Sequence, residues 1–309
     1  MYREFFQLTR APFEMAPDPA FLVLGESHRE GLATLVYGVQ SRKGFVLLTG
    51  EVGTGKTTLL HALLGQLDST TASAFIFNPR LEPLDFFHML FADFGIEKVC
   101  RTKAEYLLAL NDFLIERLER DETALLIVDE AQNLSLEMLE EVRLLSNLET
   151  PSSKLLQIML VGQPELNDLL AKPELRQLRQ RIVLRHHLRP FDEKELDVYI
   201  TERLRVAGHT GEEIFTRSAR RKLFAVTEGV PRLVNIVCDG AMLAGYAQEQ
   251  RKINGGLIME VARDLQLVPG TESFGKSVGS GGRKRRPSLS GWRGWLNLFR
   301  RTGAERVDG

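Results

Sequence analysis

Cysteine is scarce in this 309-residue sequence, which contains only Cys100 and Cys238, far apart along the chain. Two isolated cysteines exclude a disulfide framework and favour a reducing compartment. No run approaches the ~18 uninterrupted apolar residues of a transmembrane helix, and the N-terminus lacks the apolar core of a secretory signal. The six histidines show no metal-ligand spacing. These absences predict a soluble cytoplasmic protein without a disulfide framework or a histidine metal centre.

Net charge is also nearly absent, at −1, and its distribution along the chain is more informative than its sum. Residues 283–309 contain eight arginines and lysines but only two acidic residues, so an acidic body ends in a basic tail. Residues 269–282, PGTESFGKSVGSGG, have the composition of a flexible linker between the two.

Short apolar runs dominate the first two thirds of the chain and are too continuous for half-exposed strands. They are residues 44–50, 73–78, 123–130, 154–162 and 181–188. Helical patterns lie between them, at residues 56–67, 85–94, 103–119 and 135–148. This alternation predicts an α/β domain with a parallel sheet covered by helices, over residues 44–190. The spacing then becomes helical throughout, which predicts a small all-α domain over 191–268. Residues 1–43 form an N-terminal segment.

A glycine-rich stretch follows the first predicted strand and fits G-x-x-x-x-G-K-[ST], with the required strand before it and helix after it. Glycines let backbone N–H groups close around phosphate oxygens, and the following helix points its N-terminus at the same anion. We expect Lys56 to reach the β- and γ-phosphates of ATP, and Thr57 to ligate Mg²⁺. The predicted nucleotide-binding residues here are Gly50, Glu51, Val52, Gly53, Thr54, Gly55, Lys56, Thr57 and Thr58.

A second motif, LLIVDE, ends an apolar strand in two carboxylates. Asp129 is expected to hold Mg²⁺ together with Thr57, and Glu130 to orient and deprotonate the attacking water. The same pair would suit the start of a helix, since AQNLSLEMLEEV follows. The phosphate loop upstream favours the catalytic interpretation.

Several further polar residues are candidates for contacts near the γ-phosphate. Gln163 follows an apolar strand, where it either positions water or simply ends the strand before a proline. Arg181, with Arg179 and Arg176 as second and third choices, could reach a neighbouring subunit's ATP site, although each also fits a solvated helix face. Arg232 lies in the first turn of a helix, an unfavourable place for a cation that a bound phosphate would offset.

Together these segments resemble an AAA+ ATPase, and more closely the ExeA-like, general secretion pathway protein A group, which includes ATPases of MSHA pilus biogenesis and exosortase systems. The resemblance covers about residues 1–268. It is carried by MYREFFQLTRAPFEMAPDPAFL, GEVGTGKTTLL, FNPRL, LLIVDEAQNLSLEMLEEVRLLSNLET, LLQIMLVGQPEL, LRQLRQRI and GVPRLVN.

The resemblance implies a P-loop NTPase core with a helical lid, and roles for individual residues. It implies Walker A and Walker B roles for Lys56, Thr57, Asp129 and Glu130, sensor 1 for Gln163, sensor 2 for Arg232 and an arginine finger near Arg181. It further implies that residues 12–19 pack near the adenine, and that the protein works as a homo-oligomer.

The resemblance also implies Mg²⁺-dependent ATP hydrolysis that drives a cell-envelope assembly, such as type II secretion, a pilus or exopolysaccharide export. Related proteins often continue through a membrane span into a peptidoglycan-binding domain, and this sequence has neither. An envelope role would therefore pass through a partner protein or the tail. Two alternatives remain: a DNA-associated AAA+ ATPase of transposition type, and a nucleotide-gated scaffold with little turnover, which Glu130 disfavours.

The basic tail carries aromatic residues at helical spacing. On a helix, Trp292, Trp295, Leu296 and Phe299 share one face and the arginines lie elsewhere. An aromatic face combined with a basic face predicts an interfacial helix at the inner-membrane surface. A partner groove, nucleic-acid phosphates and a solvated tail are the alternatives.

Overall fold

The computed structural model describes residues 1–15, 18–68, 70–77, 82–151 and 153–268, which belong to one compact unit. The predicted linker at 269–282 and the basic tail at 283–309 lie outside the described residues. The membrane, partner and nucleic-acid interpretations of the tail therefore stay predictions.

Five parallel strands form one sheet within the described residues, in the order β2-β3-β4-β1-β5. They are β1 Phe45–Gly50, β2 Thr71–Ile76, β3 Thr123–Val128, β4 Leu156–Gly162 and β5 Ile182–Leu188. The predicted parallel α/β sheet is confirmed. This order places β3, β4 and β1 side by side, so the residues that follow these strands meet at one edge of the sheet.

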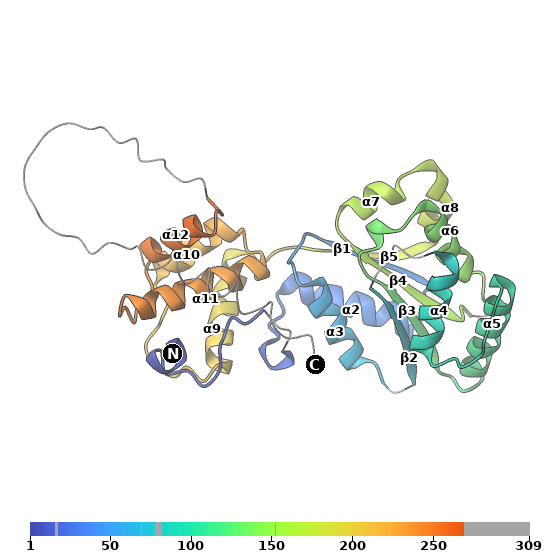
Figure 1. Cartoon of the computed structure of the whole chain (residues 1–309), viewed down its shortest axis with the longest axis horizontal. Helices are drawn as coiled ribbons and strands as arrows, with labels where there is room; N and C mark the ends of the chain where they lie inside the picture. Colours follow the sequence, from blue (N-terminus) through green and yellow to red (C-terminus); the bar gives the residue numbers. More distant parts are fainter. Residues whose placement is uncertain (16–17, 69, 78–81, 152, 269–309) are drawn as a thin grey trace, which may run out of the picture. The chain divides into compact units, whose positions relative to one another are not determined.

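Helices cover both faces of the sheet (Figure 1). They are α2 Glu26–Gln40, α3 Lys56–Gln66, α4 Pro83–Phe94, α5 Lys103–Glu119, α6 Leu136–Leu145, α7 Glu165–Leu170 and α8 Arg176–Arg181. Alternate strand residues belong to two separate cores, one shared with α2 and α3 and the other with α4, α5 and α6. This double coverage explains why the strands are continuously apolar.

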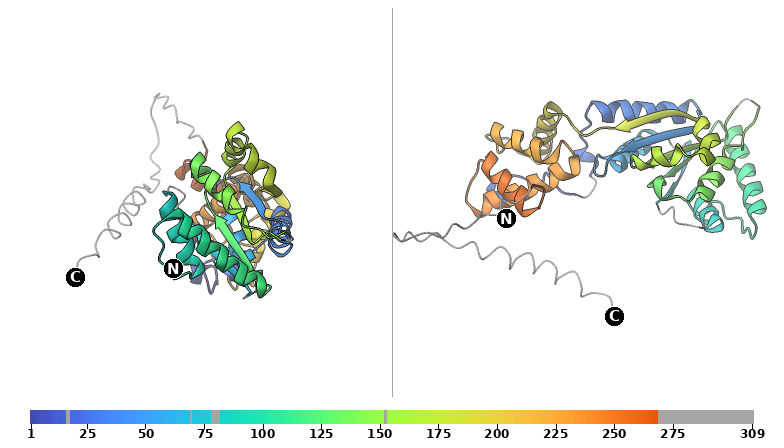
Figure 2. Two further views of the ribbon diagram at one scale, coloured as in Figure 1. Left: turned by 90° about the vertical axis from the view of Figure 1, so that its right-hand side faces the viewer. Right: turned by 90° about the horizontal axis from the view of Figure 1, so that it is seen from above.

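A second domain contains helices α9 Glu193–Val206, α10 Arg217–Thr227, α11 Pro231–Ala247 and α12 Gly255–Asp264. The predicted all-α lid is confirmed. Its core also takes in Phe6, Leu8, Phe13 and Phe21 from the N-terminal segment, which contains the short helix α1 Tyr2–Phe5 and a 3-10 turn at Pro19–Phe21. Figure 2 shows this N-terminal end of the chain beside the lid helices. The described residues 1–15 and 18–21 thus pack with the lid, whereas α2 packs on the sheet.

Gly229 lies at the junction between the sheet domain and the lid, and its conformation requires glycine. Its φ is +74°, its carbonyl oxygen accepts a 3.0 Å hydrogen bond from the N–H of Phe191, and a Cβ would lie 1.9 Å from the Phe191 oxygen. The two segments therefore touch through their backbones, and no side-chain rotation can make room there.

We expect Gly229→Ala to lower the free energy of unfolding by about 3 kcal/mol and the Tm by about 10 °C, because the new Cβ overpacks a backbone contact at positive φ. Gly65→Ala is the control, since a Cβ at Gly65 in α3 meets nothing within 4 Å. That control is expected to be stabilised by about 0.5–1 kcal/mol. Thermal unfolding of both variants measures the difference; a Gly229→Ala protein as stable as wild type would contradict the assignment.

Candidate functional site

A cavity of about 450 Å³ lies against the phosphate loop and draws its walls from four parts of the chain. These are the loop itself, the ends of β3 and β4, the N-terminal segment and the lid. The lining residues include Glu14, Met15, Asp18, Phe21, Leu22, His28, Gly53, Gly55, Lys56, Thr57, Thr58, Glu130, Gln163, Phe191, Tyr199, Arg203, Pro231, Arg232 and Asn235. The cavity thus brings together predicted residues up to 218 positions apart in sequence, from Glu14 to Arg232.

The phosphate loop joins β1 to α3 and contains two glycines at positive φ. Gly53 has a φ of +81° and Gly55 a φ of +99°. A Cβ at Gly53 would lie 2.8 Å from the Arg232 Cβ, and one at Gly55 would lie 3.2 Å from the His28 Nε2. We expected glycine there to leave room for phosphate oxygens. These glycines also admit close contacts with the lid and with α2.

Lys56 is buried at the first position of α3, with 7% of its surface exposed. Its ammonium donates hydrogen bonds to the carbonyl oxygens of Gly50 at 2.8 Å and Glu51 at 3.1 Å. Burial lowers the pKa of Lys56, and the nearby carboxylates of Glu130 and Asp129 oppose that shift. An ammonium has three donors, so one remains for a phosphate oxygen in the cavity.

Two carboxylates follow β3, as the motif predicts, and they differ in their surroundings. Asp129 is 7% exposed, its Oδ1 accepts the Glu130 N–H at 2.9 Å, and burial raises its pKa against that hydrogen bond and the charge of Lys56. Glu130 has a left-handed backbone, with φ +50°, and lines the cavity, whereas Asp129 is absent from the described lining residues. The strained turn presents the Glu130 carboxylate to the cavity.

Two amide side chains hold one oxygen of the Glu130 carboxylate. Glu130 Oε2 accepts hydrogen bonds from Gln132 Nε2 and, at 3.2 Å, from Gln163 Nε2. Gln132 Oε1 in turn accepts the Gln163 N–H at 3.1 Å. The described residues give Oε1 of Glu130 no donor, so that oxygen is available to a water molecule. Gln163 thus lies beside the candidate base, at the end of the adjacent strand β4.

Arg232 reaches the same cavity from the lid. It lies in the first turn of α11, directly after Pro231, and its N–H donates to the Gly53 carbonyl oxygen at 3.2 Å. Its side chain is exposed and forms no ion pair with the described residues. The first turn of α11 therefore touches the phosphate loop, and the guanidinium of Arg232 is available to an anion.

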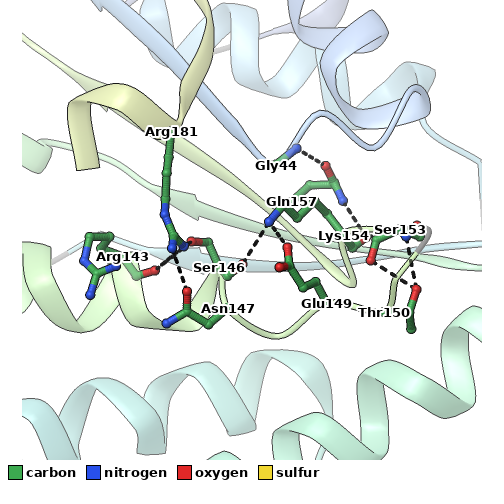
Figure 3. Close-up of polar contacts among 10 residues, drawn as sticks. All are labelled: Gly44, Arg143, Ser146, Asn147, Glu149, Thr150, Ser153, Lys154, Gln157 and Arg181. Atoms are coloured by element: carbon green, nitrogen blue, oxygen red, sulfur yellow. Dashed lines mark hydrogen bonds and ion pairs between the residues drawn. The ribbon is translucent and has the colours of Figure 1, made fainter. Parts of the chain in front are cut away.

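Arg181 does not line the cavity; Figure 3 shows its side chain directed at Arg143, Ser146 and Asn147 instead. At the end of α8 its guanidinium points to the C-terminal end of α6, where it donates to Ser146 Oγ, to Asn147 Oδ1 at 2.7 Å and to the Arg143 carbonyl oxygen at 3.5 Å. Arg176 and Arg179 are exposed. Which of the three acts as a finger stays a prediction.

A polar network from the lid lines the part of the cavity nearest the N-terminal segment. Buried Arg203 donates to the Pro12 carbonyl oxygen at 2.5 Å and to the Tyr199 hydroxyl at 2.8 Å, and that hydroxyl donates to Asn235 Oδ1 at 2.8 Å. Of the segment predicted near adenine, Glu14, Met15 and Asp18 line the cavity. Contact with adenine itself stays a prediction.

Several residues in these walls were not singled out from the sequence. Gln132 belongs to the conspicuous stretch VDEAQNL, but only the fold brings it between Glu130 and Gln163. Three others, His28, Tyr199 and Arg203, lie outside the quoted motifs, and Asn235 ends the stretch GVPRLVN but was given no role there. The apolar spacing of Leu32, Leu35 and Val39 would have identified α2, but not the role of a single histidine on it.

Comparison with known proteins gives two sequence matches. Residues 39–170 match the model of a family described as an AAA domain. The chain is 42% identical over 299 residues to general secretion pathway protein A of Aeromonas hydrophila, an alignment that covers 96% of this chain and 54% of that protein. The chain therefore spans about half the length of this relative.

Solved structures with the same fold are more distant in sequence. One is Drosophila ORC bound to DNA, with a TM-score of 0.63 and 19% identity over 85% of this chain and 66% of that chain. Another is Aeropyrum pernix ORC2 in ADPNP–ADP complexes, with a TM-score of 0.61 and 18% identity over 83% of this chain and 72% of that chain. A third is Cdc6p from Pyrobaculum aerophilum, with a TM-score of 0.60 and 16% identity over 85% of this chain and 70% of that chain. At these identities they show the fold alone. In the described part of the chain, no helix has the length and apolar character needed to cross a bilayer.

Proposed function

Because this chain is an AAA+ protein of the ExeA-like group, we propose that it hydrolyses ATP with Mg²⁺ and uses the resulting conformational change in a cell-envelope assembly. The observation that carries the proposal is the single cavity lined by Lys56, Thr57, Glu130, Gln163 and Arg232. These side chains supply a cation, an oxygen ligand, a carboxylate, an amide and a second cation, which are the groups that phosphoryl transfer requires.

In this mechanism the N–H groups of the phosphate loop and Lys56 bind the β- and γ-phosphates. Glu130 accepts a proton from the attacking water, held in place by Gln132 and Gln163. Arg232 contacts the γ-phosphate from the lid, so that ATP holds the two domains together and hydrolysis weakens that link.

Thr57 and Asp129 are the oxygen ligands proposed for Mg²⁺. Thr57 is exposed and lines the cavity, and Oδ1 of Asp129 already accepts a backbone N–H. In the described residues no group of three or more His, Cys, Asp or Glu side chains could hold a metal. Two protein oxygen ligands, Thr57 and Asp129, suit Mg²⁺, because this ion usually keeps several water molecules and phosphate oxygens as its other ligands. When bound, the ion neutralises charge on the phosphate oxygens.

We further propose that the active form is a homo-oligomer in which a neighbouring chain adds an arginine to the site. Arg181 would have to leave Ser146 and Asn147 to do so, whereas Arg176 and Arg179 are exposed. A secretion-system or other envelope protein is the proposed partner, which is supported by the relative named above. The protein would then be cytoplasmic and reach the inner-membrane surface through residues 283–309.

The experiment that tests this function is steady-state ATP hydrolysis by the full chain, titrated with anionic liposomes in one series and duplex DNA in another. We expect Mg²⁺-dependent turnover that liposomes stimulate, and a loss of that stimulation when residues 283–309 are deleted. Stimulation by DNA alone, with a steep salt dependence, would replace the envelope assignment with the DNA-associated alternative. Absence of turnover under all conditions would leave only the nucleotide-gated scaffold.

Arg232→Ala is expected to lower kcat/KM for ATP by at least about tenfold, because a charge-assisted contact with the γ-phosphate is lost. Arg232→Lys should recover part of that loss, since it keeps the charge but not the planar fork. Arg217→Ala is the control, because Arg217 is exposed on the same domain and does not line the cavity. Equal kinetics for Arg232→Ala and Arg217→Ala would remove Arg232 from the mechanism.

A further inference from the structure

His28 is a buried histidine that contacts the phosphate loop from outside the recognised motifs. It lies in the first turn of α2, is 3% exposed, and its Nε2 is 2.9 Å from the Thr54 carbonyl oxygen. A carbonyl oxygen only accepts hydrogen bonds, so Nε2 carries the proton. Nδ1 has no partner among the described residues. The bond to Thr54 is therefore the ring's one hydrogen bond within the described part of the chain.

That bond determines the orientation of a peptide group in the phosphate loop. In a planar trans peptide the C=O and N–H point in opposite directions. Because His28 holds the Thr54 carbonyl, the N–H of Gly55 in the same peptide points away from His28. Gly55 lines the cavity and is the N-cap residue of α3. The histidine thus fixes one of the donors that we expect to face a phosphate.

The same ring also contacts the junction with the lid. Its centroid lies 5.0 Å from that of Phe191, and the Phe191 N–H donates to the Gly229 carbonyl oxygen three residues before Arg232. Beside it, Glu195 of α9 accepts the N–H of Glu26, in the first turn of α2. A chain of contacts therefore runs from Thr54 through His28 and Phe191 to the segment that carries Arg232.

We propose that His28 is a positioning residue for nucleotide binding, which fixes the Thr54–Gly55 peptide toward the phosphates and ties it to the lid. The inference rests on the proposed ATP-binding function. Burial lowers the pKa of His28, which keeps the ring neutral and suits a single donated hydrogen bond. A space-filling role beside Gly55 is the alternative, and it requires no donor.

Two variants of equal length separate these roles. In His28→Gln the amide nitrogen is as many bonds from Cβ as Nε2 of histidine, so it can donate to the Thr54 carbonyl; His28→Met has the same length without a donor. Both lose the ring contact with Phe191 equally. We expect the affinity of His28→Gln for ATP to stay within about threefold of wild type. His28→Met should bind ATP about tenfold more weakly than His28→Gln, because the buried Thr54 carbonyl then loses its hydrogen-bond donor.

The measurement is equilibrium binding of ATP to the full-length variants, with the Tm recorded for each. Equal ATP affinities for the two variants would overturn the proposal in favour of simple space filling. If His28→Met does not fold, His28→Phe replaces it, since it keeps an aromatic ring against Phe191 and also lacks the donor. Binding requires no turnover: a wild-type chain that binds no ATP contradicts the proposed function, whereas equal binding by both variants contradicts only this inference.

Discussion

Glu130→Gln is expected to lower kcat for ATP hydrolysis by about 10³-fold while the affinity for ATP stays within a few-fold of wild type. A general base typically contributes 10²–10⁴-fold to the rate. Glutamine has nearly the same shape, so one oxygen can still accept a hydrogen bond from Gln163, but an amide cannot take the proton of the attacking water. The variant should therefore bind ATP and retain it.

The surroundings of Glu130 explain why the effect should fall on turnover. Gln132 and Gln163 both hold Oε2, and the described residues leave Oε1 without a donor. Lys56 and the phosphate loop, which we propose supply the binding energy for ATP, do not hydrogen-bond to this carboxylate in the described structure. A change confined to the proton acceptor should leave them in place.

Glu137→Gln provides a matched control for Glu130→Gln. Glu137 lies in the first turn of α6, is exposed and does not line the cavity, so its replacement removes one negative charge without touching the site. Single-turnover hydrolysis and equilibrium ATP binding should be measured for both variants. If Glu130→Gln turned over ATP as fast as Glu137→Gln, the base would have to be another group, and the scaffold alternative would gain support.

The parts of the site that the sequence revealed are those written in short contiguous stretches. Lys56 and Thr57 begin the helix that follows β1, and Glu130 follows β3, so local order was enough to single out these three cavity-lining residues. The continuous apolar runs predicted the strands because a parallel sheet buries both of its faces. Nothing local states the strand order, although that order is what brings Glu130 and Gln163 next to the phosphate loop.

The remaining parts depend on contacts between segments far apart in sequence. The hydrogen-bonded network of Tyr199, Arg203 and Asn235 reaches the Pro12 carbonyl oxygen through Arg203. This contact exists only because the N-terminal segment packs into the lid core. Arg181 has a helix-end position that suits a finger, yet its partners on α6 could not be inferred from LRQLRQRI. Periodicity identifies which face of an element is buried, but it does not identify the opposite partner.

Lys56→Ala is expected to weaken ATP binding by about 10³-fold, and hydrolysis should become undetectable at millimolar ATP. At about 4 Å, and with the effective dielectric constant of ~20 that suits protein sites, one ammonium–phosphate interaction is worth about 4 kcal/mol. That energy corresponds to roughly a thousandfold change in Kd. Because Lys56 is buried, water screens its charge less than it would at an exposed position.

Loss of this lysine should also change its neighbours in a measurable direction. The charge of Lys56 lowers the pKa of Asp129, against the effect of burial, so its removal should raise that pKa further and weaken the proposed Mg²⁺ ligand. Lys172→Ala is the control, since Lys172 is exposed and does not line the cavity. Calorimetric titration with ATP and with Mg²⁺ measures both effects. If Lys56→Ala bound ATP with wild-type affinity, the cavity would not be the site that holds the phosphates. The roles proposed for Glu130, Gln163 and Arg232 would then also be wrong.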